Sequence, residues 1–224
     1  LSQGFQADNQ AIKEFIQSLK RDDILFIEAP RSLTLGGMRN LSCEIATGEI
    51  LCQWDDDDLY HPHRLMTQYK ALLSQGVIAS CYSQHLKYYA NTHELYWVDW
   101  SQETPLWRTL LCGSVMFYKD IFYSCKNKLY PISGRQSNRE EDLNVLLKLD
   151  RTGKIAPIRY GYHYTYVFHG ENTYDLDHHN LVLNKRIMTA EELLLHRGLL
   201  SETFKLIGLE HVIVRSLDSV VFEV

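Results

Sequence analysis

The stretch that decides the fold is Glu49–Arg64, EILCQWDDDDLYHPHR. Its apolar run, Ile50–Trp54, has a helical pattern before it and another after it, which predicts a buried strand of a parallel sheet. Four consecutive acids, Asp55–Asp58, follow at once. Pro62 comes next, and Arg64 opens an amphipathic helix. We therefore expect the acids at a fixed junction between a strand and a helix.

Four adjacent carboxylates repel one another, so a fold that gathers them at a strand end requires a compensating positive charge. Carboxylate oxygens suit hard divalent ions such as Mg²⁺, Mn²⁺ and Ca²⁺. In open α/β sheets, ligands lie beyond the carboxyl ends of the strands. The acids therefore predict a divalent-metal site. For the run considered alone, a solvated acidic turn is the alternative.

The composition is that of a globular protein. The 224 residues suffice for one sizeable core, and 45% are hydrophobic and 23% charged. The formal net charge of -5 argues against a nucleic-acid partner. No apolar run approaches the ~18 residues of a membrane span, although peripheral membrane contact stays open. The five cysteines form no CxxC motif, which indicates reduced thiols and predicts a cytoplasmic location.

The stretch Leu35–Leu65, LGGMRNLSCEIATGEILCQWDDDDLYHPHRL, resembles the core of family 2 glycosyltransferases. In that family an Arg-Asn pair opens a helix, an A-x-G-E turn leads into a strand, and the strand ends in a DXD-type motif followed by a proline. The resemblance covers roughly residues 5 to 180. It implies a GT-A fold, a Rossmann-like α/β architecture with a mixed central sheet flanked by helices. Such a fold holds a nucleotide-sugar donor through a divalent metal, Mn or Mg.

The resemblance also implies a set of binding residues. The metal ligands are expected to be Asp57, Asp55 and His169. The nucleotide-sugar contacts are expected to be Arg39, Asn40, Asp55, Asp56, Gly113 and Ser114. His163, His178 and His179 stay open as rivals of His169, and a structural role for His169 is equally open. Arg39 as a surface residue and Asn40-Leu41-Ser42 as a chance glycosylation sequon are the alternatives at the helix start.

A second acidic group stands at the head of a predicted helix, Asn138–Lys148. Acids in a first helical turn are favoured by the helix dipole, which is a purely structural explanation. In the resembling family, a Glu-Asp pair at this place supplies the base of inverting transfer. Glu141 and Asp142 match it, so we expect Asp142 to take the proton from the acceptor hydroxyl, with Glu141 as its neighbour.

The remaining patterns predict further elements and a domain division. We expect helices over Asn9–Leu19, Arg39–Thr47 (with Gly48 as its C-cap), Arg64–Ser74 and the tail through Phe204. We expect strands over Ile24–Ile27, Val77–Tyr82, Leu110–Tyr118, Ile155–Tyr160, and a hairpin-like pair at Val212–Arg215 and Val220–Val224. The aromatic stretch His85–Trp107 is either a sugar-stacking platform or an antiparallel excursion packed by its own rings. Residues 1–185 are expected to form the transferase domain, and residues 186–224 an extension packed on it.

The chain begins at a point where the resembling family already has a strand, a helix and a strand that grip the nucleotide base. We expect either that the natural chain starts earlier or that part of the usual nucleotide pocket is missing. The function predicted is an inverting, metal-dependent transfer of sugar from a nucleotide donor to a hydroxyl acceptor of a glycan, polysaccharide or glycoconjugate. A degenerate transferase domain serving as a binding module, a metal-dependent phosphoesterase and a glycoside hydrolase are the alternatives.

Overall fold

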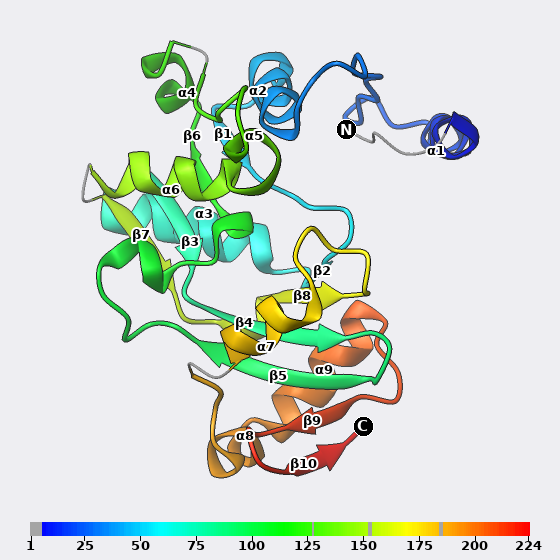
Figure 1. The fold of residues 1–224 in the computed structure, drawn as a ribbon, viewed down its shortest axis with the longest axis vertical. Helices are drawn as coiled ribbons and strands as arrows, with labels where there is room; N and C mark the ends of the chain where they lie inside the picture. The colour runs from blue at the N-terminus through cyan, green and yellow to red at the C-terminus, as the bar shows by residue number, and fades with distance from the viewer. Residues whose placement is uncertain (1–5, 127, 152–153, 184–185) are drawn as a thin grey trace. The chain divides into compact units, whose positions relative to one another are not determined.

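The computed structural model describes residues 6–126, 128–151, 154–183 and 186–224 (Figure 1). The chain divides into two compact units. The first comprises residues 1–49 and 119–145, and the second comprises residues 50–118 and 146–224.

The first unit is helical in its described residues. Its elements are α1 (Gln6–Ser18), α2 (Leu35–Ile45), α4 (Asp120–Ser124), α5 (Gln136–Arg139) and the start of α6 (Glu141–Asp150). The Thr34 hydroxyl caps α2 by accepting the Gly37 N–H, and Ala46 rather than the predicted Gly48 is its C-cap. The strand expected at residues 24–27 is absent. A strand forms where a neighbour takes up its backbone hydrogen bonds, and no described residue pairs with this segment.

Two close contacts hold α2 against the segment that follows α4 within this unit. The buried Asn40 amide donates to the Tyr130 carbonyl at 2.9 Å and accepts the Tyr130 N–H at 3.0 Å. At Gly36, a Cβ atom would lie 2.0 Å from the Pro131 carbonyl oxygen, so only glycine allows this approach. Helix α2 thus begins at Leu35 rather than at the predicted Arg39, and Asn40, inside the helix, has a packing role in the fold.

The second unit contains a four-stranded sheet in the order β1-β6-β3-β7. Its strands are β1 (Ile50–Cys52), β6 (Met116–Tyr118), β3 (Ala79–Tyr82) and β7 (Ile155–Ile158). Among the described residues of this sheet, β3 and β7 form the parallel pair, whereas β1 pairs antiparallel with β6. The expectation that β1 belongs to a parallel ladder is therefore wrong. An apolar run indicates burial but carries no signal for the direction of the neighbouring strand. Helix α3 (Arg64–Gln75) packs on β3 and β7 and ends at Gly76, whose φ is 58°.

A six-stranded sheet forms the rest of this unit, in the order β10-β9-β5-β4-β8-β2. Its strands are β10 (Val220–Glu223), β9 (Ile213–Arg215), β5 (Glu94–Asp99), β4 (Gln84–Tyr89), β8 (Tyr164–Phe168) and β2 (Leu59–Tyr60). The aromatic stretch forms the antiparallel pair β4–β5, and its rings are buried or half-buried. Trp97, for example, is 2% exposed. The burial of these rings favours the antiparallel excursion packed by its own rings over the sugar-stacking platform.

The C-terminal part packs on the same sheet. The predicted tail helix is two helices, α8 (Ala190–Leu195) and α9 (Arg197–Ile207), because the chain leaves helical geometry at His196. Thr189 and Glu192 form a capping box at the start of α8. The hairpin-like pair is confirmed as β9 and β10. One core joins these elements to β4 and β5 through Leu86, Leu95, Trp97, Leu193, Leu200, Phe204, Val214 and Phe222.

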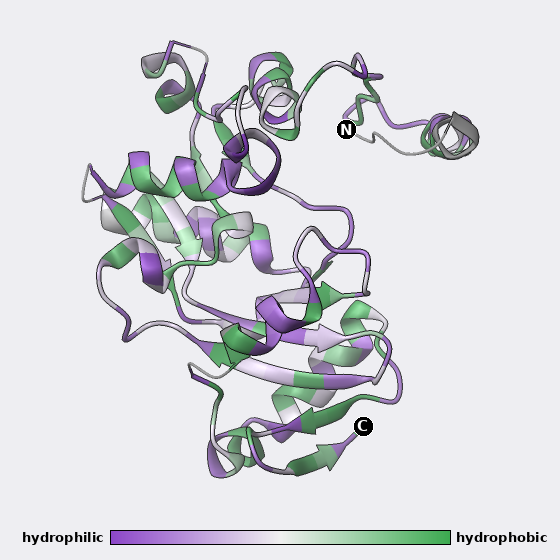
Figure 2. Ribbon diagram, viewed as in Figure 1, coloured by the Kyte–Doolittle hydropathy of each residue, from purple (hydrophilic) through white to green (hydrophobic). Residues whose placement is uncertain are grey.

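The remaining described elements are short: α7 (Leu176–Leu183) and the 3-10 turns η1 (Leu106–Thr109), η2 (Cys112–Ser114) and η3 (Gly161–His163). The strand expected over 110–118 is therefore confined to β6, with η2 before it. In Figure 2, α6 carries alternating polar and apolar segments, as expected for an amphipathic helix with Val145, Leu146 and Leu149 buried. Among the described residues, no helix combines the length and the apolar character that crossing a membrane requires.

Candidate metal and donor site

The four acids occupy the tight loop between β1 and β2, and they face different surroundings. Asp56 and Asp57 are exposed, Asp55 is half-buried and Asp58 is buried. The loop is closed on itself by Tyr60, whose hydroxyl donates to the Asp55 carbonyl at 2.7 Å and accepts the Asp55 N–H at 3.0 Å. The backbone at Asp55 is therefore fixed by a side chain five residues away.

Asp58 anchors this loop to β8. The Tyr164 hydroxyl donates to Asp58 Oδ2 at 2.6 Å, and the Val167 N–H donates to Oδ1 at 2.9 Å. Burial raises the pKa of Asp58 to about 7, and the two hydrogen bonds act in the opposite direction. Both oxygens of Asp58 therefore bond within the fold, which separates this residue from the three other acids.

Arg64 lies beneath the loop and is fully buried. Its guanidinium carbon is 4.6 Å from the Trp54 ring centroid, 4.3 Å from that of Tyr60 and 4.8 Å from that of Tyr164. Nη2 donates to the Gln53 carbonyl at 2.7 Å, and Nε donates to Gln68 Oε1 at 3.2 Å. A cation enclosed by three aromatic faces and bonded to the strand end holds the base of the acidic loop. From the sequence alone, Arg64 is expected only as the first residue of a helix.

The predicted ligand His169 lies beside the acids. Its Nε2 is 3.5 Å from Asp57 Oδ2. Its three rivals contact other groups: His163 stacks on His61, His179 meets Lys87, and His178 stacks on Tyr174. Carboxylate oxygens with one imidazole nitrogen form a donor set that suits Mn²⁺. His169 and Asp57 are therefore placed to share a divalent ion, and Asp55 as a third ligand stays a prediction.

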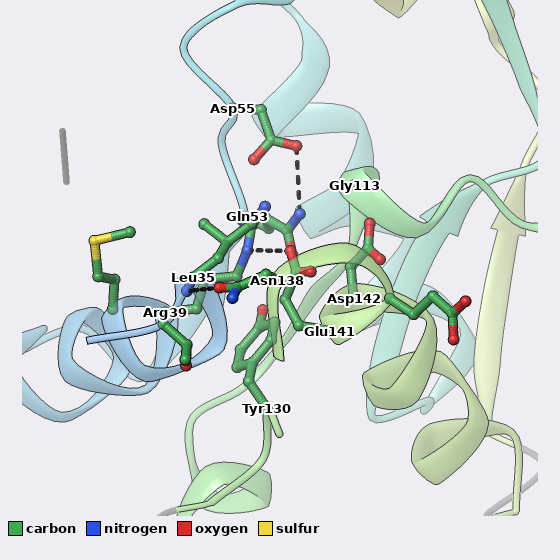
Figure 3. A network of polar contacts seen from close by, with 12 residues as sticks. Leu35, Arg39, Gln53, Asp55, Gly113, Tyr130, Asn138, Glu141 and Asp142 are labelled. Carbon is green, nitrogen blue, oxygen red and sulfur yellow. Dashed lines mark hydrogen bonds and ion pairs between the residues drawn. The ribbon is translucent and has the colours of Figure 1, made fainter. Parts of the chain in front are cut away.

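Gly113 is packed against the same loop. A Cβ atom at this position would lie 2.9 Å from Asp55 Oδ2 and 3.2 Å from the Tyr164 hydroxyl. Gln53 Nε2 also donates to Asp55 Oδ2, at 3.4 Å (Figure 3). Because residue 113 has no side chain, the Asp55 carboxylate can occupy this position without a steric clash. Ser114, by contrast, is buried, and its hydroxyl bonds to the backbone of Leu111 and Tyr82.

In the first unit, the predicted Arg39 and Glu141 lie together. Arg39 Nε donates to Glu141 Oε1 at 3.0 Å, and Asn138 Oδ1 accepts the Leu35 N–H at 2.9 Å (Figure 3). Glu141 is 3% exposed, so this ion pair is largely shielded from water. Arg39 was expected to face a diphosphate, and this contact instead directs Nε towards the head of α6.

Asp142 follows directly at the head of α6 and is half-buried. Its Oδ1 accepts the Leu143 N–H at 2.7 Å. That contact is compatible with the helix-start role. Asp142 belongs to the first unit and the acidic loop to the second.

The model of the glycosyl transferase family 2 matches residues 7–133, more than half of the chain. The chain belongs to this family. No curated protein matches it in sequence. Membership in glycosyl transferase family 2 identifies the mixed α/β structure as a GT-A fold and the chain as a glycosyltransferase at the family level. Nucleotide-sugar donors and acceptors are accordingly its partners at that level.

The family match includes Arg39, the acidic loop and Gly113, and it ends before Glu141, Asp142 and His169. Glycosyl transferase family 2 is often divalent-metal dependent, in agreement with the donor set around Asp57. The roles of the three later residues rest on the resemblance and on their own surroundings. Tyr60, Tyr164 and Arg64 are the residues that sequence reasoning missed, and the signal available was their aromatic and cationic character next to the acids.

Proposed function

We propose that this family 2 glycosyltransferase moves a sugar from a nucleoside-diphosphate donor to a hydroxyl acceptor, with inversion and with a divalent metal. The observation that supports it best is the 3.5 Å approach of His169 Nε2 to Asp57 Oδ2 on a loop anchored by other residues. The acceptor class is a glycan, polysaccharide or glycoconjugate hydroxyl. Residues 1–185 form the proposed transferase domain, with residues 186–224 as its extension.

Asp57, Asp55 and His169 would hold the ion. When bound, a divalent ion neutralises the charge that develops on the leaving diphosphate. The bonds of Tyr60 to the Asp55 backbone and of Tyr164 to Asp58 anchor the loop on either side of Asp57, which supports this assignment. Asp56 is exposed beside them and is our candidate for a donor contact, and Gly113 is our candidate for the backbone that the donor sugar approaches.

Asp142 is the proposed base that accepts the proton of the attacking hydroxyl. The adjacent Glu141 is tied to Arg39, so the first turn of α6 is held by an ion pair with little access to water. Such a support restricts the motion of the neighbouring carboxylate, as a positioned proton acceptor requires. In this proposal Arg39 contributes through Glu141 as well as through any donor contact, and Asn40 contributes through its bonds to Tyr130.

The test compares Mn²⁺ binding to the parent chain and to the Asp57→Asn variant, measured by electron paramagnetic resonance. The measurement is repeated with each of a panel of uridine, guanosine and deoxythymidine diphosphate sugars. We expect the loss of one ligand charge to weaken Mn²⁺ affinity at least about tenfold, and donor binding to lose its Mn²⁺ dependence. Asp218→Asn, an exposed acid in the turn between β9 and β10, is the matched control and should bind like the parent chain. Unchanged Mn²⁺ affinity in Asp57→Asn would remove the metal assignment.

A further inference from the structure

Three histidines gather in the second unit, apart from the acidic loop. His61 follows β2, His63 precedes the first residue of α3, and His163 ends η3. One ligand nitrogen from each lies within 4.8 Å of the other two. The backbone joins two of them directly, because the His61 N–H donates to the His163 carbonyl at 3.2 Å. The cluster thus connects a helix start to a turn about one hundred residues later in the chain.

Two of these rings, His61 and His163, are buried and stack on one another. A neutral imidazole has a lone pair for a metal, whereas an imidazolium has none. The Tyr82 hydroxyl lies 3.4 Å from His163 Nδ1, so it can fix that ring through the nitrogen opposite the metal-binding one.

We propose that His61, His63 and His163 form a second metal site, for a borderline transition-metal ion of the Zn²⁺ class. Three imidazole nitrogens leave a fourth tetrahedral position open, and hard ions such as Mg²⁺ and Ca²⁺ prefer oxygen ligands. His63 is exposed, which gives the ion a route to the cluster. His61 and His163 are buried, which limits competition by water.

Loading requires small ring movements. Zn–N bonds of about 2.0 Å place ligand nitrogens roughly 3.4 Å apart, so the three nitrogens must draw closer. The His61 and His163 rings are now stacked at 4.8 Å and 21°, so at least one must rotate. His61 Nδ1 accepts the His63 N–H at 3.1 Å. If the ion binds Nε2, the proton of the neutral ring moves to Nδ1 and this hydrogen bond is given up.

An ion at this site would join the β2–α3 junction to η3, which leads directly into β8. Strand β2 has only two residues, Leu59 and Tyr60, and their pairing with β8 carries the Asp58 anchor of the acidic loop. We infer that the ion acts as a structural tie for that pairing, without contacting the donor. The inference is independent of the proposed function, because it concerns a different donor set.

The experiment measures Zn²⁺ and Co²⁺ binding to the chelator-treated chain by titration calorimetry and by the visible absorption of bound Co²⁺. His63→Ala is the test variant, because an exposed ring can be removed without disturbing the core. His178→Ala, an exposed histidine on α7, is the matched control. Asp57→Asn removes the acidic loop as a competing site.

We expect one equivalent of Zn²⁺ in Asp57→Asn, and the same equivalent in the parent chain and in His178→Ala beside any ion that the acidic loop binds, each with a raised melting temperature. We expect His63→Ala to lose at least about tenfold in affinity and the tetrahedral Co²⁺ spectrum. Circular dichroism of His63→Ala establishes that it is folded. Equal Zn²⁺ affinity in His63→Ala and the parent chain would overturn the proposal, as would a loss in Asp57→Asn alone or a parent chain that binds no Zn²⁺.

Discussion

Replacing Lys87 by methionine should change the pH dependence of stability. Lys87 is 2% exposed, and its Nζ lies 2.9 Å from His179 Nδ1 and 3.3 Å from the His179 carbonyl. Among the described residues, no carboxylate lies within ion-pair distance of it. Burial lowers the pKa of Lys87 from its ordinary value of 10.5 to about 7. The buried ammonium is thus held without a counter-ion.

The sign of the effect follows from proton binding. Between pH 7 and 10.5 the unfolded chain keeps the Lys87 proton and the folded chain releases it, so the stability of the parent chain rises with pH in this window. Below pH 7 Lys87 is protonated in both the folded and the unfolded chain. The folded state then bears the whole free-energy cost of burying the ammonium, at most about 5 kcal/mol. Methionine removes that cost but leaves two His179 acceptors without this donor, which costs about 1–3 kcal/mol each at most.

We therefore expect the stability of Lys87→Met relative to the parent chain to be highest near pH 6 and to fall by up to about 1.4 kcal/mol per pH unit between pH 7 and pH 10. Urea unfolding at pH 6, 7, 8, 9 and 10 measures the difference in free energy of unfolding between variant and parent. Lys205→Met, an exposed lysine on α9, should show a difference that does not vary with pH. A flat difference for Lys87→Met would refute the reasoning, because it would mean that the ammonium stays hydrated and charged.

Three further predictions concern single residues. Asp142→Asn should retain Mn²⁺ and donor binding and lose roughly 10²- to 10⁴-fold in turnover, measured by sugar transfer; a cost of only about 0.3–1 kcal/mol in stability with normal turnover would make it a helix-start acid. His169→Ala should weaken Mn²⁺ binding less than Asp57→Asn does, since a neutral ligand carries no charge; equal or larger loss argues against that ranking. Gly36→Ala should destabilise the first unit by roughly 1–3 kcal/mol or more, because its Cβ would meet the Pro131 carbonyl at 2.0 Å; a urea midpoint unchanged from the parent would mean that this segment moves aside.

The sequence located the acidic loop and its flanking helix because both depend on local pattern. It could not tell the four aspartates apart, since Asp58 acquires its role from Tyr164, 106 residues later. The predicted pairing direction of β1 was wrong for a similar reason, because its partner β6 lies more than sixty residues later in the chain. His169 was predicted by resemblance, and its place beside Asp57 arises only when β8 pairs with β2. The Arg39–Glu141 pair joins two segments that sequence reasoning had treated separately.

Two features of the fold reduce the electrostatic repulsion among the four acids. Asp58 is taken into the fold by two hydrogen bonds, and the Arg64 cation sits in its aromatic cage under the strand end. The carboxylates of Asp55 and Asp57 take no part in these two anchors, although the Tyr60 ring that contacts Arg64 also bonds to the Asp55 backbone. The contacts of Tyr60, Tyr164 and Arg64 are made by protein groups alone, so they hold the backbone of the loop without an ion. If an ion binds at the proposed site, an anchored loop reduces the affinity lost to reorganisation of the protein.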